Sequence, residues 1–371
     1  MKVISLGVDS NLFKEGSPVR ARQVEYGKLV DELYIVTYTQ LGVRDSKLAS
    51  VKLGENVWVY PTNSKNRLSY FWDAYKIARD ILRDNPGRYI ITSQEGMTNF
   101  VALFLSLKFK LGIEMQVHTD IFSKYFRKES LTNKFRLFGY WLAARRARSI
   151  RVVSKRIAKG LRERWHVPGN KITVLPVYVD SSRWQEVQGG VDLHKQYPDA
   201  SHIILMASRI TPEKNFPLAL RSFERVRARY PKARLIVVGD GPLAHLIKGE
   251  GIELLPWAAD LSSLYRSADI FLLTSNYEGY GLTLIEAAIS GTPIVTTDVG
   301  IVGSIINPHN ALIAEVGDVN KVAAHLIFLL QNQDARIMMS ERLKKVAEKL
   351  PDKETYQKLF KQSWEKCLNQ K

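Results

Sequence analysis

Two carboxylates flank a tight glycine turn in the second half of the chain, in the segment EGYGLTLIE at 278–286. Gly279 and Gly281 allow the backbone to approach an anion closely, and the amides of Gly281 and Leu282 would open a helix whose positive end favours phosphate. An acid beside a phosphate repels it, so Glu278 and Glu286 are expected to accept hydrogen bonds from hydroxyls. The segment therefore predicts a binding site for a ligand in which phosphate is linked to sugars.

Two further loops carry the groups that such a ligand needs. Arg209 and Lys214 lie five positions apart in a loop before a predicted helix, and two cations that converge on a diphosphate would stabilise it as a leaving group. Gly239 and Gly241 follow another predicted strand. All three loops are predicted to meet at one edge of one sheet.

The elements that must position these residues are a strand and a helix on either side of Glu278. An apolar run at 270–273 predicts a short strand, and the run 281–289 predicts a helix that Ser290-Gly291 ends. Glu278 is therefore expected in the loop past the carboxyl end of a strand, where open α/β sheets bind ligands.

Strand-like runs alternate with helical patterns along the whole chain, which indicates an α/β protein with mostly parallel sheets. A length of 371 residues favours two domains. The predicted strands are 2–8, 33–38, 57–60, 89–92, 115–118, 150–153 and 172–175 in the first half, and 203–207, 235–238, 252–255, 270–273, 293–296 and 311–314 in the second. A polar stretch at 176–200 predicts the connection between the domains. Residues 352–369 predict an amphipathic helix.

These motifs, in this order and spacing, resemble the nucleotide-sugar domain of the retaining glycosyltransferases of family 4, also called group 1. The match rests on the 209–215 loop, the 239–242 loop, the Glu278 and Glu286 pair, and Gly291-Thr292-Pro293. The resemblance implies the GT-B fold, with two Rossmann-like domains facing a cleft: residues 1–180 for the acceptor, 181–352 for the donor, and a helix at 353–371 that returns to the first domain.

The resemblance also implies a role for each donor-site residue. Arg209 and Lys214 would bind the donor diphosphate, Glu278 the hydroxyls of the transferred sugar, and Glu286 the ribose. The distal phosphate would meet the backbone of four residues, which are Gly279, Tyr280, Gly281 and Leu282. Gly239 would line the site, and Trp257 stands where the family holds the base, although it could equally pack at the rim. Retention without a metal or other cofactor would follow.

In the first half the resemblance is looser. His118, at the end of a predicted strand, matches a histidine that the family places against the donor sugar, although a structural role is the alternative. Gly16, in Gly16-Ser17, resembles a glycine loop near the diphosphate, where the family usually has two glycines. The family's Asn-Gly-Val-Asp at the domain junction is replaced by residues 177–180, VYVD.

The charge is concentrated in the first half. Net charge is +17, with 32 basic and 16 acidic residues in 1–185 against 22 and 21 in 186–371, and residues 124–171 hold 15 basic and 2 acidic side chains. A basic helix within 124–171 could lie on an anionic membrane, or it could be a core helix with a solvated face. A single cysteine, Cys367, and the absence of a secretory signal favour the cytoplasm, at the inner membrane face.

We therefore expect a retaining hexosyltransferase that moves a hexose from a nucleoside-diphosphate sugar, with UDP favoured, to a lipid-linked or saccharide acceptor. A sugar-nucleotide epimerase and a noncatalytic sugar-nucleotide sensor would use the same pocket. The pI of about 9.7 also suggests a nucleic-acid-binding protein. No zinc-finger spacing or RNA-binding aromatic signature supports that alternative, so no nucleic-acid partner is expected.

Overall fold

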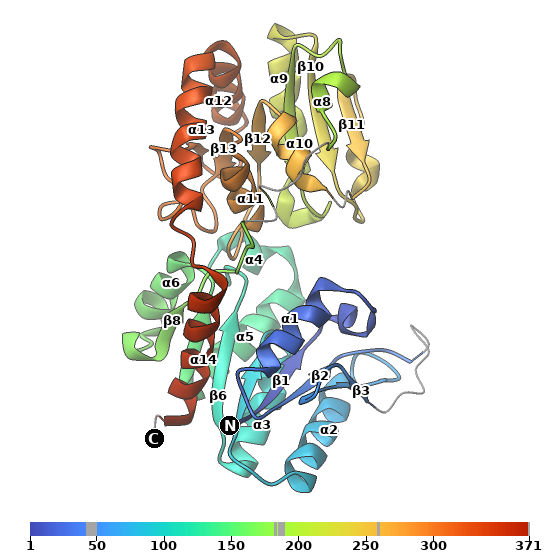
Figure 1. Cartoon of the computed structure of the whole chain (residues 1–371), viewed down its shortest axis with the longest axis vertical. Coiled ribbons are helices and arrows are strands. Elements are labelled where there is room, and N and C mark those ends of the chain that lie inside the picture. Colours follow the sequence, from blue (N-terminus) through green and yellow to red (C-terminus); the bar gives the residue numbers. More distant parts are fainter. Residues whose placement is uncertain (42–49, 182–183, 185–189, 258–259, 370–371) are drawn as a thin grey trace. The chain divides into compact units, whose positions relative to one another are not determined.

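The structure, a computed structural model, describes residues 1–41, 50–181, 184, 190–257 and 260–369. The chain forms two compact units. The first contains Met1–Pro176 together with Glu354–Lys371, and the second contains Val177–Lys353 (Figure 1). Residues 354–369 thus belong to the first unit although they follow the whole of the second in sequence.

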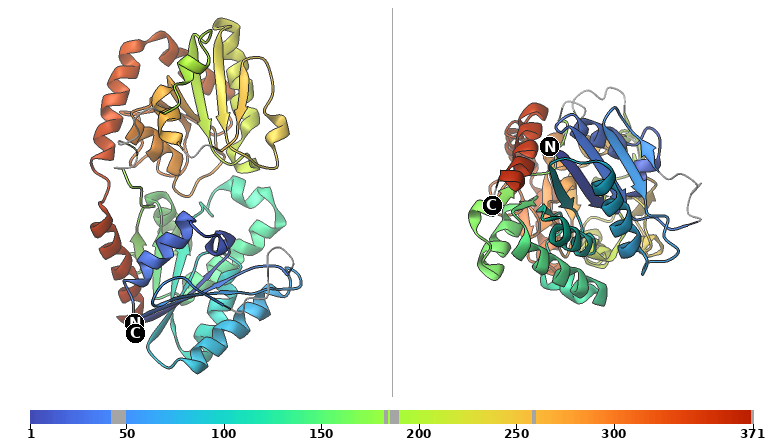
Figure 2. Two further views of the ribbon diagram at one scale, coloured as in Figure 1. Left: turned by 45° about the vertical axis from the view of Figure 1, so that its right-hand side comes forward. Right: turned by 90° about the horizontal axis from the view of Figure 1, so that it is seen from below.

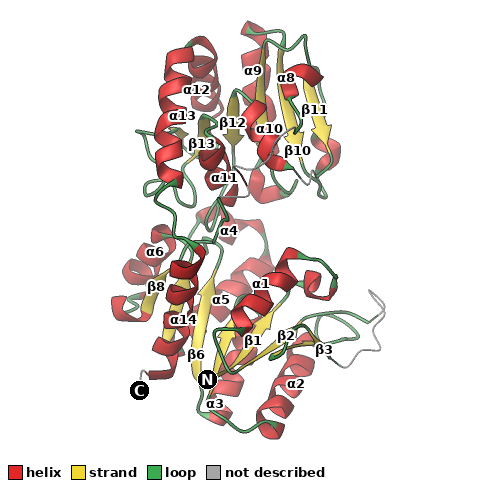
Figure 3. Ribbon diagram, in the orientation of Figure 1, coloured by secondary structure: helices red, strands yellow, loops and turns green. Residues whose placement is uncertain are grey.

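The first unit is built on an eight-stranded sheet in the order β3-β4-β2-β1-β5-β6-β7-β8. All neighbouring strands are parallel except β3 and β4. The strands, drawn yellow in Figure 3, are β1 Lys2–Gly7, β2 Glu32–Thr37, β3 Val51–Lys52, β4 Val57–Pro61, β5 Tyr89–Ser93, β6 Gly112–Val117, β7 Ser149–Val152 and β8 Ile172–Val174.

Helices cover both faces of this sheet (Figure 2). The connections from β4 to β5, from β5 to β6 and from β6 to β7 all advance along the sheet in one direction, so their helices α2, α3 and α5 lie on the same face of the sheet. Helix α1 connects β1 to β2 in the opposite direction and lies on the other face. The helix α14 packs beside α1, where Tyr26 stacks on Phe360. The helices of this unit are η1 Ser10–Phe13, α1 Pro18–Gly27, α2 Tyr70–Asp84, α3 Thr98–Phe109, α4 Lys124–Glu129, α5 Leu131–Arg146, α6 Lys155–Trp165, η2 Gly169–Lys171 and α14 Lys353–Asn369.

The second unit has a six-stranded parallel sheet in the order β11-β10-β9-β12-β13-β14. Its strands are β9 His202–Ala207, β10 Ala233–Val238, β11 Ile252–Leu255, β12 Ile270–Leu273, β13 Ile294–Thr297 and β14 Leu312–Ala314. Its helices are α8 Leu193–Gln196, η3 Pro212–Lys214, α9 Phe216–Arg229, η4 Ala244–Leu246, α10 Leu261–Ser267, α11 Leu282–Ser290, α12 Val319–Gln331 and α13 Gln333–Ala347.

The strand order of the second unit reverses between β9 and β12. From β9 the chain moves outward to β10 and β11, then returns to the other side of β9 and continues through β12, β13 and β14. The loops at the carboxyl ends of β9 and β12 therefore diverge, and such a switch point is where open α/β sheets bind ligands. Arg209 and Lys214 follow β9, and Glu278 follows β12.

The α/β architecture predicted from the sequence is confirmed. Every predicted strand forms, with ends that differ by at most three residues, and the helix predicted at 281–289 begins and ends one residue later. Strand β3 was not predicted, because two residues at the antiparallel edge of the sheet give no periodic pattern. His118 follows β6 instead of ending it.

Candidate functional site

The loops that follow β9 and β12 are joined by hydrogen bonds. The Asn276 amide donates to the Glu213 carbonyl at 2.7 Å, and Thr274 Oγ1 donates to the Lys214 carbonyl at 3.0 Å. Asn215 Nδ2 donates to Asn276 Oδ1 at 2.9 Å. Asn215 also has a left-handed backbone (φ 50°), which asparagine tolerates better than most residues, and it caps α9. These bonds fix the backbone on which Lys214 is carried.

Lys214 forms an ion pair with Glu278 across the two loops. Lys214 Nζ lies 2.5 Å from Glu278 Oε1, and Ser275 Oγ donates to the same oxygen at 2.7 Å. Both charged side chains are largely buried, with 12% of Lys214 and 13% of Glu278 exposed. A cation and an acceptor are thus held side by side at the switch point.

Arg209 does not join this pair. Its side chain is 76% exposed, and Nη2 lies 3.4 Å from Glu213 Oε1. The structure therefore brings Lys214 and Glu278 together, whereas Arg209 lies in the same loop with its guanidinium in solvent.

The glycine turn leads directly into α11. Gly281 is the N-cap residue with φ 88°, a conformation that glycine adopts without strain, and no side chain caps the helix. The first amides of α11 are thus available to an anion. The Tyr280 side chain is buried, which leaves its backbone as the group that could meet a ligand. Leu282, by contrast, is 39% exposed.

Gly300 supports the turn from the neighbouring loop. The Ile301 amide donates to the Tyr280 carbonyl at 3.0 Å. Gly300 has φ 58°, and a Cβ there would lie 2.3 Å from the Tyr280 carbonyl oxygen and 3.0 Å from the Glu278 Cβ. Only glycine fits between this loop and the turn that carries Glu278.

Glu286 lies one turn inside α11 and has a raised pKa. Burial raises the pKa of this carboxyl from 4.5 to about 7, against the hydrogen bond from Tyr265 and the charge of Lys214, which lower it. Tyr265 OH donates to Glu286 Oε2 at 3.0 Å. This carboxyl can therefore change charge near neutral pH.

Gly239 and Trp257 follow the next two strands. A Cβ on Gly239 would lie 2.0 Å from the Ser208 carbonyl oxygen, so this glycine lets the loops after β9 and β10 touch. Trp257 lies just after β11, and its side chain is 56% exposed.

His118 and Gly16 belong to the first unit. Gly16 has φ 71° and precedes Ser17, which caps α1. His118 lies just past β6, with Nε2 3.0 Å from Gln116 Oε1. The residue is exposed at the end of the strand, yet its dense surroundings and the charges of Arg151 and Arg22 lower the pKa of the ring, which is thus neutral at pH 7.

The sequence reasoning missed the residues that hold the named ones in place. Ser275, Asn276, Gly300 and Tyr265 contact the site residues without carrying a motif of their own. Only Gly300 gave a signal, because a glycine after a strand suggests a close backbone approach. Within the described residues, no three His, Cys, Asp or Glu side chains are grouped so that they could hold a metal ion.

Comparison with known proteins places this geometry in a family. Residues 194–346 match the profile of the glycosyl transferases of group 1. An uncharacterized glycosyltransferase of Methanocaldococcus jannaschii is 24% identical over 73% of the chain and 70% of its own length. The sulfoquinovosyl transferase of Arabidopsis thaliana is 26% identical over 86% of the chain and 64% of its own length.

Solved structures share the fold over the whole chain. The sucrose-phosphate synthase of Thermosynechococcus elongatus superimposes with a TM-score of 0.78 at 17% identity, over 98% of each chain. Anabaena HepE, solved in complex with UDP and glucose, gives 0.74 at 16% identity, over 98% of this chain and 99% of its own. These structures confirm the predicted GT-B fold. Residues 194–346 therefore form a domain of the group 1 glycosyl transferases, and the chain is a glycosyltransferase.

Proposed function

We propose that this enzyme transfers a hexose, with retention of the anomeric configuration, from a nucleoside-diphosphate sugar to a lipid-linked or saccharide acceptor at the cytoplasmic face of a membrane. The observation that carries the donor assignment is the Lys214 and Glu278 pair beside the uncapped start of α11. Lys214 supplies a cation for one phosphate, Glu278 supplies an acceptor for sugar hydroxyls, and the first amides of α11 supply donors for a second phosphate.

Lys214 is proposed to neutralise the diphosphate as it leaves. In the ligand-free site its charge is balanced by Glu278, so the ammonium is already in position. Preorganised charges of this kind lower the barrier because they need not reorganise as the leaving group becomes negative. Arg209, on its exposed side chain, would turn from Glu213 to the diphosphate when the donor binds. Glu286 would accept from the ribose.

UDP is the proposed nucleotide on the strength of the relatives. HepE was solved with UDP-glucose, and TarM of S. aureus in complex with UDP. A galactosyltransferase of Escherichia coli that is 24% identical over 47% of the chain is named for UDP-Gal. We propose that no metal is needed, since Lys214 and the amides of α11 supply positive charge at the diphosphate.

A thermal-shift panel tests the donor assignment. UDP-glucose, GDP-mannose and ADP-glucose would each be added to the parent protein and to Lys214→Ala, with and without EDTA. A ligand at 100 times its Kd stabilises by about 2.7 kcal/mol. We expect a UDP-sugar to raise the melting temperature of the parent with EDTA present and to have little effect on Lys214→Ala. An equal shift in both proteins would contradict the assignment.

The membrane-facing surface is proposed to be the outer side of α2, α3 and α5. These helices pack side by side on one face of the sheet, and six of their large apolar side chains are exposed. We name this surface the aromatic face and define it by Trp72, Phe104, Leu107, Leu131, Phe135 and Phe138. Exposed apolar side chains in such number suit a surface that is covered in use.

Basic side chains surround the aromatic face. Helices α3 and α5 contain no acidic residue, and their exposed cations are Lys108, Lys134, Arg145 and Arg146. Each Lys or Arg near an anionic lipid surface contributes about 1 kcal/mol. Within the described residues, no helix is both long enough and apolar enough to cross a membrane. The proposed contact combines the aromatic face with the basic side chains of α3 and α5.

Vesicle cosedimentation tests this surface. In Phe135→Ser/Phe138→Ser, two half-exposed rings are lost, and about 1 kcal/mol for each weakens binding to anionic vesicles roughly 30-fold. The matched control is Phe328→Ser on α12, whose ring is 46% exposed in the second unit. Equal binding by the two variants would contradict the proposed surface.

A further inference from the structure

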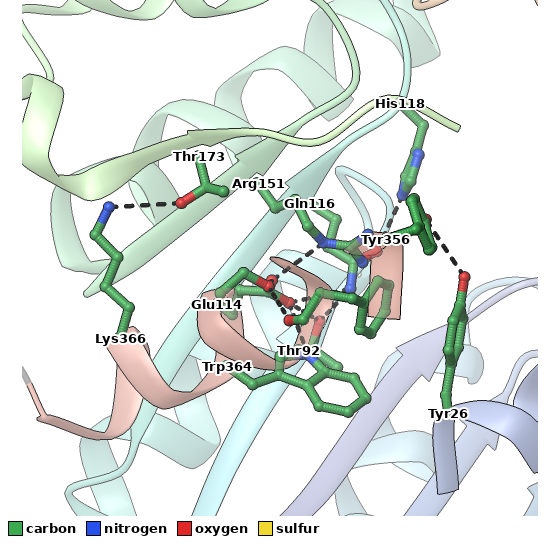
Figure 4. Close-up of polar contacts among 12 residues, drawn as sticks. Tyr26, Thr92, Glu114, Gln116, His118, Arg151, Thr173, Tyr356, Trp364 and Lys366 are labelled. Carbon is green, nitrogen blue, oxygen red and sulfur yellow. Dashed lines mark hydrogen bonds and ion pairs between the residues drawn. The ribbon is translucent and has the colours of Figure 1, made fainter. Parts of the chain in front are cut away.

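Glu114 is a fully buried carboxylate of the first unit, and Figure 4 shows the polar contacts around it. It lies on β6, on the face of the sheet that α14 covers. Among the described residues, its five hydrogen-bond partners are all donors. They are Arg151 Nε at 3.2 Å and Ser363 Oγ at 2.8 Å from Oε1, and Thr92 Oγ1 at 2.6 Å, Gln116 Nε2 at 3.1 Å and Trp364 Nε1 at 3.2 Å from Oε2.

This arrangement means that Glu114 accepts from every partner. Charged groups are buried only when they are paired and hydrogen-bonded, and here Arg151 supplies the opposite charge while its guanidinium also lies 4.0 Å from the Phe360 ring centre. Two of the five donors come from α14, so that helix completes the cage. The orientation of Glu114 is fixed by groups from β5, β6, β7 and α14.

The acceptors around Gln116 determine how its amide is oriented. Its Nε2 lies 2.5 Å from Thr92 Oγ1 as well as 3.1 Å from Glu114 Oε2. Thr92 gives its own proton to Glu114, so its oxygen can only accept from Gln116. Both neighbours therefore require the NH2 group on the inner side. The carbonyl Oε1 must then point outward, to His118.

A carbonyl oxygen accepts and cannot donate, so His118 Nε2 must carry the proton in the 3.0 Å contact with Gln116 Oε1. The pKa of His118 is lowered, which makes the ring neutral and leaves Nδ1 without a proton. Nδ1 lies on the far side of the ring from Gln116 (Figure 4). The exposed end of the histidine is therefore a hydrogen-bond acceptor.

We propose that Gln116, oriented by Glu114 and Thr92, is a positioning residue that holds His118 as the Nε2–H tautomer, so that Nδ1 accepts a hydrogen bond from a hydroxyl of the donor sugar. The sugar contact rests on the proposed donor binding together with the family resemblance of His118, whereas the tautomer is a property of the free protein. The class of ligand that His118 selects is thus a hydroxyl donor, and a bare acceptor such as an ether oxygen would gain nothing from it.

The tautomer is measured by two-bond ¹H–¹⁵N spectra of protein labelled with ¹⁵N-histidine at pH 7.5, with His118→Gln to assign the signal. In the parent protein we expect His118 to show the cross-peak pattern of the Nε2–H tautomer. Its Nε2–H proton should also be directly visible, because the hydrogen bond to Gln116 protects it from exchange with water. In Gln116→Met, which keeps the side-chain length but lacks the acceptor, we expect a mixture of tautomers and loss of that proton to exchange. A parent protein with Nδ1–H or an imidazolium, or an unchanged spectrum in Gln116→Met, overturns the proposal.

Two further variants guard against a folding artefact. Thr92→Val removes one of the two groups that orient the amide and should shift the tautomer in the same direction. Ser363→Ala removes a donor to Glu114 that does not touch Gln116, so its His118 spectrum should match that of the parent. A shift in Ser363→Ala as large as that in Thr92→Val would mean that general loosening, and not the amide, sets the tautomer, which overturns the proposal.

Kinetics connect the tautomer to turnover. One neutral hydrogen bond contributes about 1 kcal/mol, so Gln116→Met should lower kcat/KM for the donor about fivefold, while Ser363→Ala stays near the parent. A tautomer shift without a fall in kcat/KM overturns the positioning role. His118→Ala separates the two ideas: full activity there would show that His118 does not contact the donor sugar, whereas the spectra still decide whether Gln116 sets the tautomer.

Discussion

Replacing Lys214 and Glu278 first singly and then together should affect stability and catalysis differently. Stability should fall in each single variant and recover in the double variant, whereas activity should not recover. Lys214→Met leaves the Glu278 carboxylate without a cation, and Glu278→Gln leaves the ammonium without a carboxylate. In the double variant neither charge is present, and Ser275 Oγ can still donate to the amide oxygen of Gln at 278. Together with the parent, the three variants form a double-mutant cycle.

The magnitude follows from the burial of the pair, because 12% and 13% of the two side chains are exposed. Removing one partner of a buried pair costs about 3 kcal/mol, whereas replacing both is close to neutral. In the second unit, which contains Val177–Lys353, this corresponds to a fall of roughly 6–12 °C in Tm for each single variant. The double variant should recover most of that loss. Activity should not recover, since one lost electrostatic contact at the leaving group lowers kcat about 100-fold or more.

Differential scanning calorimetry and donor turnover measure the two patterns on the same samples. The transition of the second unit is the one that a bound UDP-sugar shifts. A Lys214→Met protein as stable as the parent would refute the pairing, and a double variant no more stable than the singles would refute the reasoning about unpaired charge. Turnover that returns in the double variant would remove Lys214 and Glu278 from catalysis.

Three other outcomes are expected. Glu286, with a pKa of about 7, should accept more strongly from the ribose when it is ionised, so UDP affinity should weaken about fivefold as pH falls below 7, and isothermal titration of Glu286→Gln should show no such change. The Glu286 carboxyl binds its proton more tightly in the folded protein than in the unfolded chain. Its contribution of roughly 3 kcal/mol to the free energy of unfolding is therefore full below pH 4.5 and is lost as pH rises to about 7. Urea titrations at several pH values would measure this loss. Gly300→Ala should raise KM for the donor severalfold, because the added Cβ displaces the Tyr280 carbonyl. The control is Gly303→Ala, where φ is 84° and the space is open, so KM should not change and only about 1 kcal/mol of stability should be lost. Equal effects of the two variants on KM would contradict the role of Gly300.

Much of the fold could be predicted from the sequence, because parallel strands buried on both faces appear as short apolar runs bounded by turn residues. Runs such as 203–207 and 270–273 gave the strands and hence the place of the loops after them. The pairing of β9 with β12 could not be predicted in this way. It depends on strand order, which no local pattern encodes, and it is what brings Lys214 next to Glu278.

The positions of the charged residues and glycines of the site could be predicted from their spacing in the sequence. Lys214, Glu278 and Gly281 lie at the switch point as the motifs suggested. Spacing did not reveal that Arg209 pairs with Glu213 in the ligand-free site, and its convergence with Lys214 on a diphosphate stays a prediction. The supporting residues, Ser275 and Tyr265 among them, contact the site through tertiary packing, and packing partners cannot be recognised from a single sequence.

The return of residues 354–369 to the first unit affects biosynthesis. A ribosome makes β6, with Glu114, long before it makes Ser363 and Trp364, and all of the second unit emerges in between. Until then the carboxylate and Arg151 lie on an uncovered sheet face, and Phe360 is not available to Tyr26. The nascent first unit should therefore remain a substrate for chaperones while its neighbour folds, and a stop codon after residue 353 should yield a protein that is degraded even though both sheets are encoded in full.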